Sequence, residues 1–170
     1  MQYKSLFVLF VLTTFLSNAQ SPMQVSSAEV SFVFIDDDVT GTLSGFSSSS
    51  TIDLDDLSNA KLMGSVNVES ISTGNSIRNW ALRRSKYFDA KTYPKISFES
   101  ETIRTNEGNI KVVGQLTIKD VTKEVSFNFK KSDSQLVGTA ALYSSDFGIS
   151  IHDDRAENKV TVKIILNLKP

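Results

Sequence analysis

The sequence predicts an all-β protein, an antiparallel eight-stranded barrel with one short helical insertion near residues 75–85. Most of the chain alternates apolar and polar residues with a period of two, which is typical of antiparallel strands with one solvated face. Short turns rich in Asn, Asp and Gly separate the alternating runs. Between residues 75 and 85 the period changes to that of a helix. Together these patterns indicate a meander of strands with a single helix inserted.

The strands follow from six alternating runs. In each run the apolar residues share one face of the strand, and the intervening residues, mostly polar, share the other. We therefore expect the apolar faces to point toward a common interior. The apolar positions are Val30, Phe32 and Phe34; Val66 and Val68; Ile96 and Phe98; Val112, Gly114, Leu116 and Ile118; Val125, Phe127 and Phe129; and Val160, Val162, Ile164, Leu166 and Leu168.

The turns and irregularities also fit a meander. Asn106–Asn109 contains residues that tolerate positive φ, and Lys119-Asp120 lies between two alternating runs. The serine-rich stretch Ser44–Thr51 is interpreted as a mobile loop or a strand corner of small side chains. The alternation slips by one residue at Glu69–Ile71, which predicts a β-bulge.

A sheet of roughly eight strands tends to close on itself, because closure removes its exposed edges. A lipocalin-like barrel of this size leaves an interior that side chains can fill or that one ligand can occupy. A two-sheet sandwich gives the same pattern and stays open as the alternative.

The helix is predicted over Ser76–Arg84, with Asn75 as its N-cap. Ile77, Trp80 and Ala81 share one face at spacings of three and four, and form an apolar stripe. The basic residues of the segment, Arg78, Arg83 and Arg84, occupy the remaining face. Pro94 ends the insertion, because it forces the preceding residue out of helical geometry.

Residues 1–19 are predicted to be a secretory signal peptide, followed by one domain over residues 20–170. Lys4 supplies the positive charge, residues 6–16 are apolar, and Ser17-Asn18-Ala19 offers small residues for cleavage near Ala19. A bilayer-spanning helix needs ~20 apolar residues, more than this run contains. We therefore expect a periplasmic or secreted protein without stable membrane insertion.

Composition argues against several classes of function. The chain has 18 basic and 19 acidic residues and a formal net charge of −1, whereas a nucleic-acid-binding domain shows a basic face and a high pI. There is no cysteine and one histidine, which disfavours a zinc site. Asp36–Asp38 and Asp53–Asp56 lack the spacing of a calcium loop. We expect no nucleic-acid partner, no metal and no cofactor.

A series of short motifs extends, in order, over nearly all of the chain after the predicted leader. The motifs are Thr73-Gly74-Asn75, Arg78, Leu82, Tyr87-Phe88-Asp89, Tyr93-Pro94-Lys95-Ile96-Ser97-Phe98, Gly114-Gln115-Leu116-Thr117-Ile118-Lys119 with Val121-Thr122-Lys123, and Asp146-Phe147-Gly148-Ile149. This series resembles the signature of the YceI-like family of lipid- and polyisoprenoid-binding periplasmic proteins.

The resemblance implies a barrel that holds a long apolar lipid, either isoprenoid-like or an acyl chain, for transport, storage or sequestration. The family has Asp and His where this chain has Asn79 and Ala81, and often a basic residue where it has Ser144. These departures predict a different or less polar head group. A homodimer is among the oligomeric states that the sequence leaves open.

The candidate ligand-binding residues combine inward-facing strand positions with residues near the helix. Aromatic and arginine side chains there could form a pocket mouth, or could equally pin the helix and be solvated. The candidates are Phe32, Phe34, Arg78, Trp80, Leu82, Phe88, Phe98, Phe127, Phe129 and Phe147.

Two alternatives come from other classes of function. One is an enzyme acting on a small hydrophobic substrate, with His152 as general base oriented by Asp153 or Asp154; it requires His152 to face the cavity. An exposed loop histidine is the simpler interpretation, and we expect a protein that is not an enzyme. The other alternative is a packed barrel whose helix recognises a partner, which an exposed apolar patch around Trp80 would favour.

Overall fold

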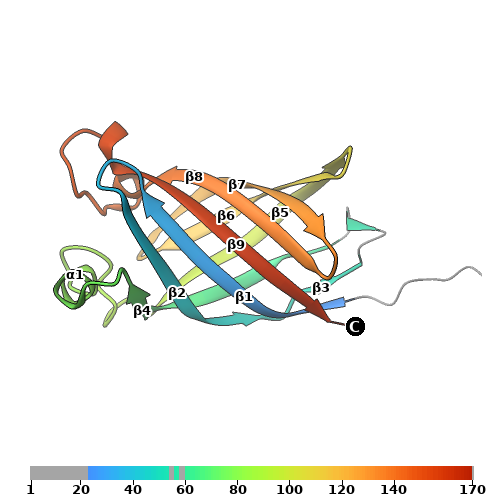
Figure 1. Ribbon diagram of the computed structural model, residues 1–170, viewed down its shortest axis with the longest axis horizontal. Helices are drawn as coiled ribbons and strands as arrows, with labels where there is room; N and C mark the ends of the chain where they lie inside the picture. Colours follow the sequence, from blue (N-terminus) through green and yellow to red (C-terminus); the bar gives the residue numbers. More distant parts are fainter. Residues whose placement is uncertain (1–22, 54–55, 58–59, 170) are drawn as a thin grey trace, which may run out of the picture.

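The computed structural model describes residues 23–53, 56–57 and 60–169, which form a barrel of tilted strands with a helix beyond one end (Figure 1). The predicted signal peptide and its cleavage point lie outside the described residues. The elements are β1 (Met23–Phe34), β2 (Val39–Ser48), β3 (Thr51–Ile52), β4 (Met63–Ser72), α1 (Ser76–Leu82), β5 (Lys95–Asn106), β6 (Asn109–Ile118), β7 (Val121–Ser132), β8 (Gln135–Tyr143), the 3₁₀ turns η2 (Ser144–Phe147) and η3 (Ala156–Asn158), and β9 (Lys159–Lys169).

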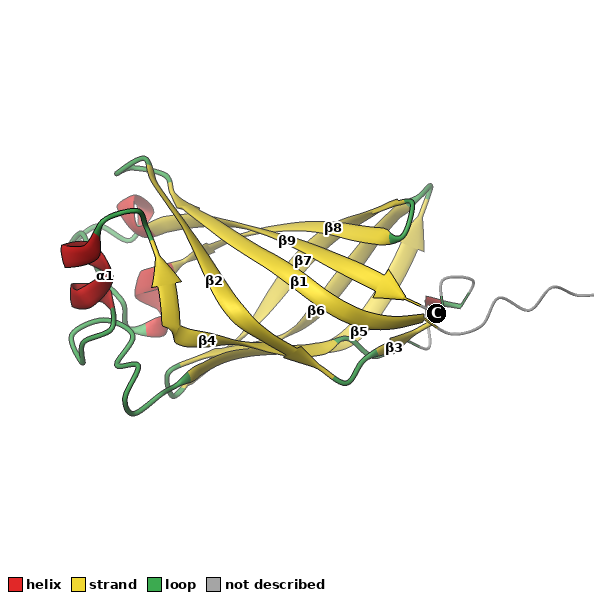
Figure 2. Ribbon diagram, turned by 60° about the horizontal axis from the view of Figure 1, so that its bottom comes forward, coloured by secondary structure: helices red, strands yellow, loops and turns green. Residues whose placement is uncertain are grey.

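Eight strands close the barrel, as predicted, and the sandwich alternative is wrong. The strand order is β2-β4-β5-β6-β7-β8-β9-β1, and β1 also pairs with β2, so the sheet returns to its starting strand. All pairings are antiparallel. The two-residue β3 is an addition at one end, where Ile52 pairs with Met23. Figure 2 shows the strands running obliquely around the axis, the tilt that closure of a small barrel requires.

The hairpin turns lie where the sequence predicts them. Glu107 and Gly108 adopt φ values of 48° and 79°, and Lys119 adopts 59°. Two consecutive residues with positive φ form the turn whose twist matches that of the flanking strands. The β5–β6 and β6–β7 ladders therefore run in register up to their turns.

The predicted bulge in β4 is present. Thr42 pairs with Ser72 and Ser44 pairs with Asn67, so residues 68–71 of β4 lie opposite Leu43 alone. The hydroxyl of Ser70 accepts a hydrogen bond from the backbone N–H of Ser44 (2.7 Å) and donates to the carbonyls of Asn67 and Ser44. The side chain thus replaces ladder bonds that the bulge removes.

The expectation for the serine-rich stretch is only partly correct. Residues 44–48 belong to β2, and Phe46 points into the barrel interior. Gly45 has a φ of 72°, a left-handed conformation that glycine adopts without steric strain. It lies between Leu43 and Phe46, whose side chains both face inward. This extra residue breaks the period of two, so the alternation did not reveal the strand.

Helix α1 has the predicted cap and ends two residues earlier than predicted. The Asn75 side chain accepts a hydrogen bond from the Arg78 N–H at 2.9 Å. Arg83 is the C-cap, and the Arg84 N–H bonds to the Ala81 carbonyl in a tighter turn. Within the part of the chain that the structure describes, no helix is long and apolar enough to cross a bilayer.

Candidate functional site

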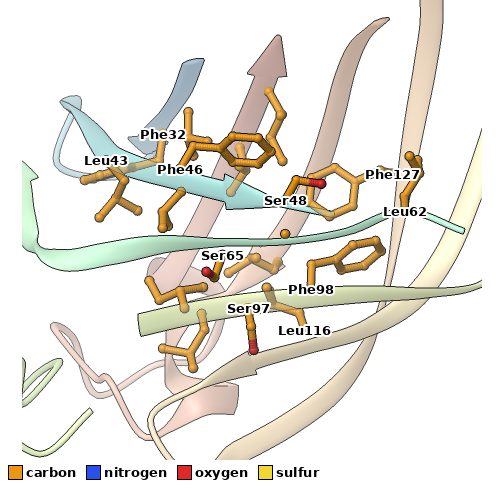
Figure 3. A pocket seen from close by; sticks show the side chains of 18 of the residues that line it. Phe32, Leu43, Phe46, Ser48, Leu62, Ser65, Ser97, Phe98, Leu116 and Phe127 are labelled. Atoms are coloured by element: carbon orange, nitrogen blue, oxygen red, sulfur yellow. The ribbon is translucent and has the colours of Figure 1, made fainter. Parts of the chain in front are cut away.

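The interior of the barrel holds an elongated apolar cavity of about 160 Å³. Its wall includes both Val25 and Phe34 of β1, nine residues apart, which corresponds to ~30 Å of strand. Every strand except β3 contributes side chains to the wall. Strand β8 does so through Leu142 alone. Figure 3 shows side chains of the wall, among them Phe32, Phe98 and Phe127, converging between the strands. The lining contains no charged residue.

Three of the five serines at the wall, Ser48, Ser50 and Ser144, are hydrogen-bonded to the protein itself. Ser48 and Ser50 both donate to the Met63 carbonyl, at 2.5 and 3.0 Å. Ser144 donates to the Ile149 carbonyl at 2.6 Å. Because these hydroxyl protons are already used, the cavity has little to offer a polar group, and its chemistry favours hydrocarbon.

Glycines on neighbouring strands make room for four of the phenylalanines. Phe32 lies directly across from Gly41, and Phe129 from Gly138, and a methyl group at either glycine would overlap the phenyl ring. A Cβ at Gly64 would lie 2.9 Å from Phe46, and one at Gly114 would lie 2.8 Å from Phe98. Each ring therefore lies over the backbone of the adjacent strand, and this leaves space along the axis.

The end of the barrel next to α1 is closed by a second apolar cluster. Leu82 of α1 is 7% exposed and packs with Phe32, Phe34, Ile71 and Val160. The chain then turns back, and the Phe88 N–H donates to the Leu82 carbonyl at 3.0 Å. Phe88 lines the cavity, so the insertion covers this end as the sequence predicts.

The apolar stripe of α1 faces away from the barrel. Trp80 and Ile77 are 58% and 78% exposed, and the inner face carries Asn79, Leu82 and Arg83 instead. The Asn79 side chain accepts hydrogen bonds from the N–H and hydroxyl of Thr73, both at 2.8 Å, and Arg83 donates to the Ile71 carbonyl at 3.1 Å. These polar contacts fix the rotation of the helix and turn the predicted apolar stripe outward.

Six of the ten candidate residues line the cavity. They are Phe32, Phe34, Phe88, Phe98, Phe127 and Phe129. Leu82 and Phe147 are buried in the packing around it, with Phe147 at 2% exposure, and Arg78 and Trp80 lie on the exposed side of α1. A role for these residues in ligand binding stays a prediction. Sequence reasoning missed Phe46 and Leu43, whose spacing is disturbed by Gly45, and Ile149 and Leu142, which lie at the ends of strands or beyond them.

His152 does not face the cavity, which removes the basis for the enzyme alternative. Its Nε2 lies 3.0 Å from an oxygen of Asp37, and its Nδ1 lies 3.9 Å from Glu157. The hydrogen bond with Asp37, with the charges of Asp37, Glu157 and Asp36, raises the pKa of His152 above its ordinary value. Neither Asp153 nor Asp154 takes the predicted orienting role. Among the described residues, no group of three or more His, Asp or Glu side chains could hold a metal ion.

The surrounding loop is held by polar contacts of its own. Arg155 forms two hydrogen bonds with Asp146, both 2.7 Å, and its guanidinium lies 3.7 Å from the centre of the Tyr143 ring. The bond to Arg155 lowers the pKa of Asp146. Asn158 is fully buried, and its amide bonds to the backbone of Ile151, His152 and Asp154. These contacts hold the loop in its conformation.

Several known proteins are similar to this chain in sequence. A UPF0312 protein of Staphylococcus aureus strain N315 is 29% identical over 125 residues, covering 67% of this chain and 71% of the relative. A UPF0312 protein of Pseudomonas aeruginosa strain LESB58 is 28% identical over 130 residues, covering 71% and 68%.

Solved structures show the same barrel. BcnA of Burkholderia cenocepacia superposes with a TM-score of 0.75 at 22% identity, covering 87% of this chain and 99% of that one. A domain from Saccharophagus degradans described as polyisoprenoid-binding gives a TM-score of 0.56 at 13% identity, covering 87% and 97%. The sequence profile of the YceI-like domain matches residues 17–168, nearly the whole chain. The protein belongs to the YceI-like domain family.

Proposed function

We propose that this protein binds one long apolar lipid chain, isoprenoid-like or acyl, inside the barrel, and that it carries, stores or sequesters that lipid. The observation that carries the proposal is the elongated cavity, whose wall is mainly apolar and whose Ser48, Ser50 and Ser144 hydroxyls are bonded to the protein. The polyisoprenoid-binding description of the Saccharophagus degradans domain supports the same class of ligand.

The size of the cavity limits how the ligand can be held. A volume of about 160 Å³ is below the ~300–1,000 Å³ of most ligand pockets. A ligand that follows this narrow, elongated space is a slender, extended chain. Bulky fused-ring lipids fit this shape poorly.

Hydrocarbon burial is strong enough to explain binding without a charged anchor in the cavity. Each buried CH₂ contributes ~0.8 kcal/mol, so ~20 carbons contribute roughly 16 kcal/mol before costs. Immobilising the chain and the protein removes ~5–15 kcal/mol. Affinity should therefore rise with chain length until the cavity is full.

We place this activity outside the cytoplasm, in the periplasm or as a secreted protein. The support is the charged start, short apolar run and small residues of positions 1–19. A carrier in an aqueous compartment would shield the lipid chain from water.

The test is native mass spectrometry of the protein purified gently from its own host, with organic extraction of bound material. We expect a discrete mass addition that extracts as a polyprenyl or acyl species. Val30→Phe, which fills the cavity, should lower the bound fraction, and Val33→Phe, an outward-facing position of the same strand, should not. A protein that carries nothing and takes up no added polyprenol would contradict the proposal.

A further inference from the structure

The exposed face of α1 does not line the cavity, so lipid binding inside the barrel gives this face no role. Among the described residues, Ile77 at 78% and Trp80 at 58% are the two most exposed large apolar side chains. They lie three residues apart on a helix whose opposite face, through Leu82, packs against the end of the barrel. Polar contacts of Asn79 and Arg83 hold the helix in this orientation. The apolar side chains are therefore held in water by the fold.

Positive charge surrounds these two side chains. The Arg84 guanidinium lies 4.2 Å from the centre of the Trp80 ring, and Lys86 lies 5.2 Å from the centre of the Tyr87 ring. Residues 76–95 contain six basic residues and one acidic residue, a net charge of +5 in a chain whose total is −1. The rest of the chain is thus net acidic. The basic charge is concentrated on the insertion that covers the cavity.

We propose that the outer face of α1, formed by Ile77, Trp80 and Arg84 with Arg78 and Lys86 nearby, docks on an anionic lipid surface. Tryptophan, aliphatic and basic side chains together are the composition of segments that lie at a membrane interface. The complementary charge is the negative surface potential of an anionic bilayer. The proposal extends the lipid-binding function and rests on it, because docking would bring the covered end of the cavity to the source of the lipid.

The geometry fits a membrane better than a folded protein partner. Stable protein interfaces bury well over ~1,000 Å², and two apolar side chains on a seven-residue helix supply little of that. A bilayer needs only shallow insertion of such side chains, together with attraction of the surrounding cations.

The orientation on the membrane follows from the acidic loops at the same end. Asp36–Asp38 lie in the β1–β2 turn, and Asp153, Asp154 and Glu157 lie in the segment before β9. Figure 1 shows these loops separated from α1 across the end of the barrel. An anionic surface would repel them, so the barrel should dock tilted, with α1 toward the lipid.

The sole tryptophan makes the test direct, because all tryptophan fluorescence reports on Trp80. Vesicles of 70% phosphatidylcholine and 30% phosphatidylglycerol should shift its emission to the blue and sediment with the protein, and pure phosphatidylcholine vesicles should not. The preparation should have an intact mass that shows residues 1–19 to be absent, since the apolar run 6–16 would itself bind lipid. Ile77→Ser and Arg84→Gln should each weaken sedimentation roughly three- to tenfold.

Ile35→Ser, at an exposed isoleucine of the acidic β1–β2 turn, is the matched control and should change nothing. Equal binding to both vesicles, no binding, or binding unaffected by Ile77→Ser and Arg84→Gln would overturn docking by α1. Bound lipid in the same variants, measured by extraction, reports separately on the cavity. If the unaltered protein carries lipid but does not dock, the inference alone is refuted. If it docks but carries and takes up no lipid, the proposed function is refuted.

Discussion

Gly138 lies directly opposite Phe129 in the β7–β8 ladder, and Gly41 lies opposite Phe32 in the β1–β2 ladder. Each glycine gives its partner ring a place against the wall. The methyl group of an alanine at either position would overlap the space that the ring occupies. The absence of two methyl groups therefore helps to determine how much of the interior is hollow.

Gly138→Ala should reduce lipid uptake, because the added methyl pushes the Phe129 ring toward the cavity axis. The free energy of unfolding should fall by ~1–3 kcal/mol, as is usual for overpacking. Uptake of a long polyprenol and urea denaturation measure the two effects. The double variant Gly138→Ala, Phe129→Leu should recover uptake, because the smaller side chain restores the space. Unchanged uptake by folded Gly138→Ala would contradict this account of the cavity.

His152 gives the protein a pH dependence whose sign is set by Asp37. The pKa of His152 is raised in the folded state, mainly by the hydrogen bond with Asp37. The charged imidazolium therefore stabilises the fold fully below the ordinary histidine pKa of ~6.5, and this contribution is lost as the pH rises through the higher folded-state pKa. Because His152 is the only histidine, an NMR titration observes it without ambiguity. Asp37→Asn should lower its pKa, and an unchanged titration would show that the pair does not form.

At the scale of elements, Asn158 organises the segment between Ile149 and β9. It is fully buried, and its amide makes four hydrogen bonds with backbone groups of that segment. Asn158→Ala would leave those backbone groups unpaired, with a cost of ~2–4 kcal/mol in the free energy of unfolding. Urea denaturation measures it. Asn128→Ala, at an exposed asparagine on β7, is the control and should stay within ~0.5 kcal/mol of the parent. Equal effects at both positions would show that the loop contacts are not structural.

The elements also show which parts of the structure the sequence could predict. Strands β6 and β7, and β5 up to the register shift between Ser100 and Thr102, alternate regularly. The period of two therefore predicted their inward residues, including Phe98, Phe127 and Phe129. The bulge in β4 was visible as a slip in the same pattern. In β2, by contrast, the left-handed Gly45 and the run of serines conceal the strand, and Phe46 was missed.

Helix α1 was predicted correctly as an element, and the sequence did not predict which of its faces meets the barrel. Leu82 lies inward and Ile77 and Trp80 lie outward, because Asn79 and Arg83 bond to Thr73 and Ile71 on the barrel side. Such long-range polar contacts depend on where the helix meets the strands. The local pattern of a seven-residue helix contains no information about them.

At the scale of the whole molecule, a ligand along the axis would contact nearly every strand, so binding should raise global stability. At a free lipid concentration of 100 times Kd, the gain is ~2.7 kcal/mol. For a domain of this size that corresponds to roughly 5–10 °C in Tm. Circular dichroism melts with a long polyprenol, compared with a short-chain alcohol as control, measure the shift. Equal Tm values with both alcohols would contradict binding along the axis.

The pairing of β1 with β9 affects how fast the barrel can form. Residues 24–34 of β1 pair with residues 160–169 of β9, so the first described strand completes its hydrogen bonds only with the last. Contacts of such high sequence separation carry a large loop-closure entropy and slow folding. A nascent chain would keep β1 without its β9 partner until residues 160–169 have been synthesised. This topology would delay closure of the barrel and keep the sheet open until then.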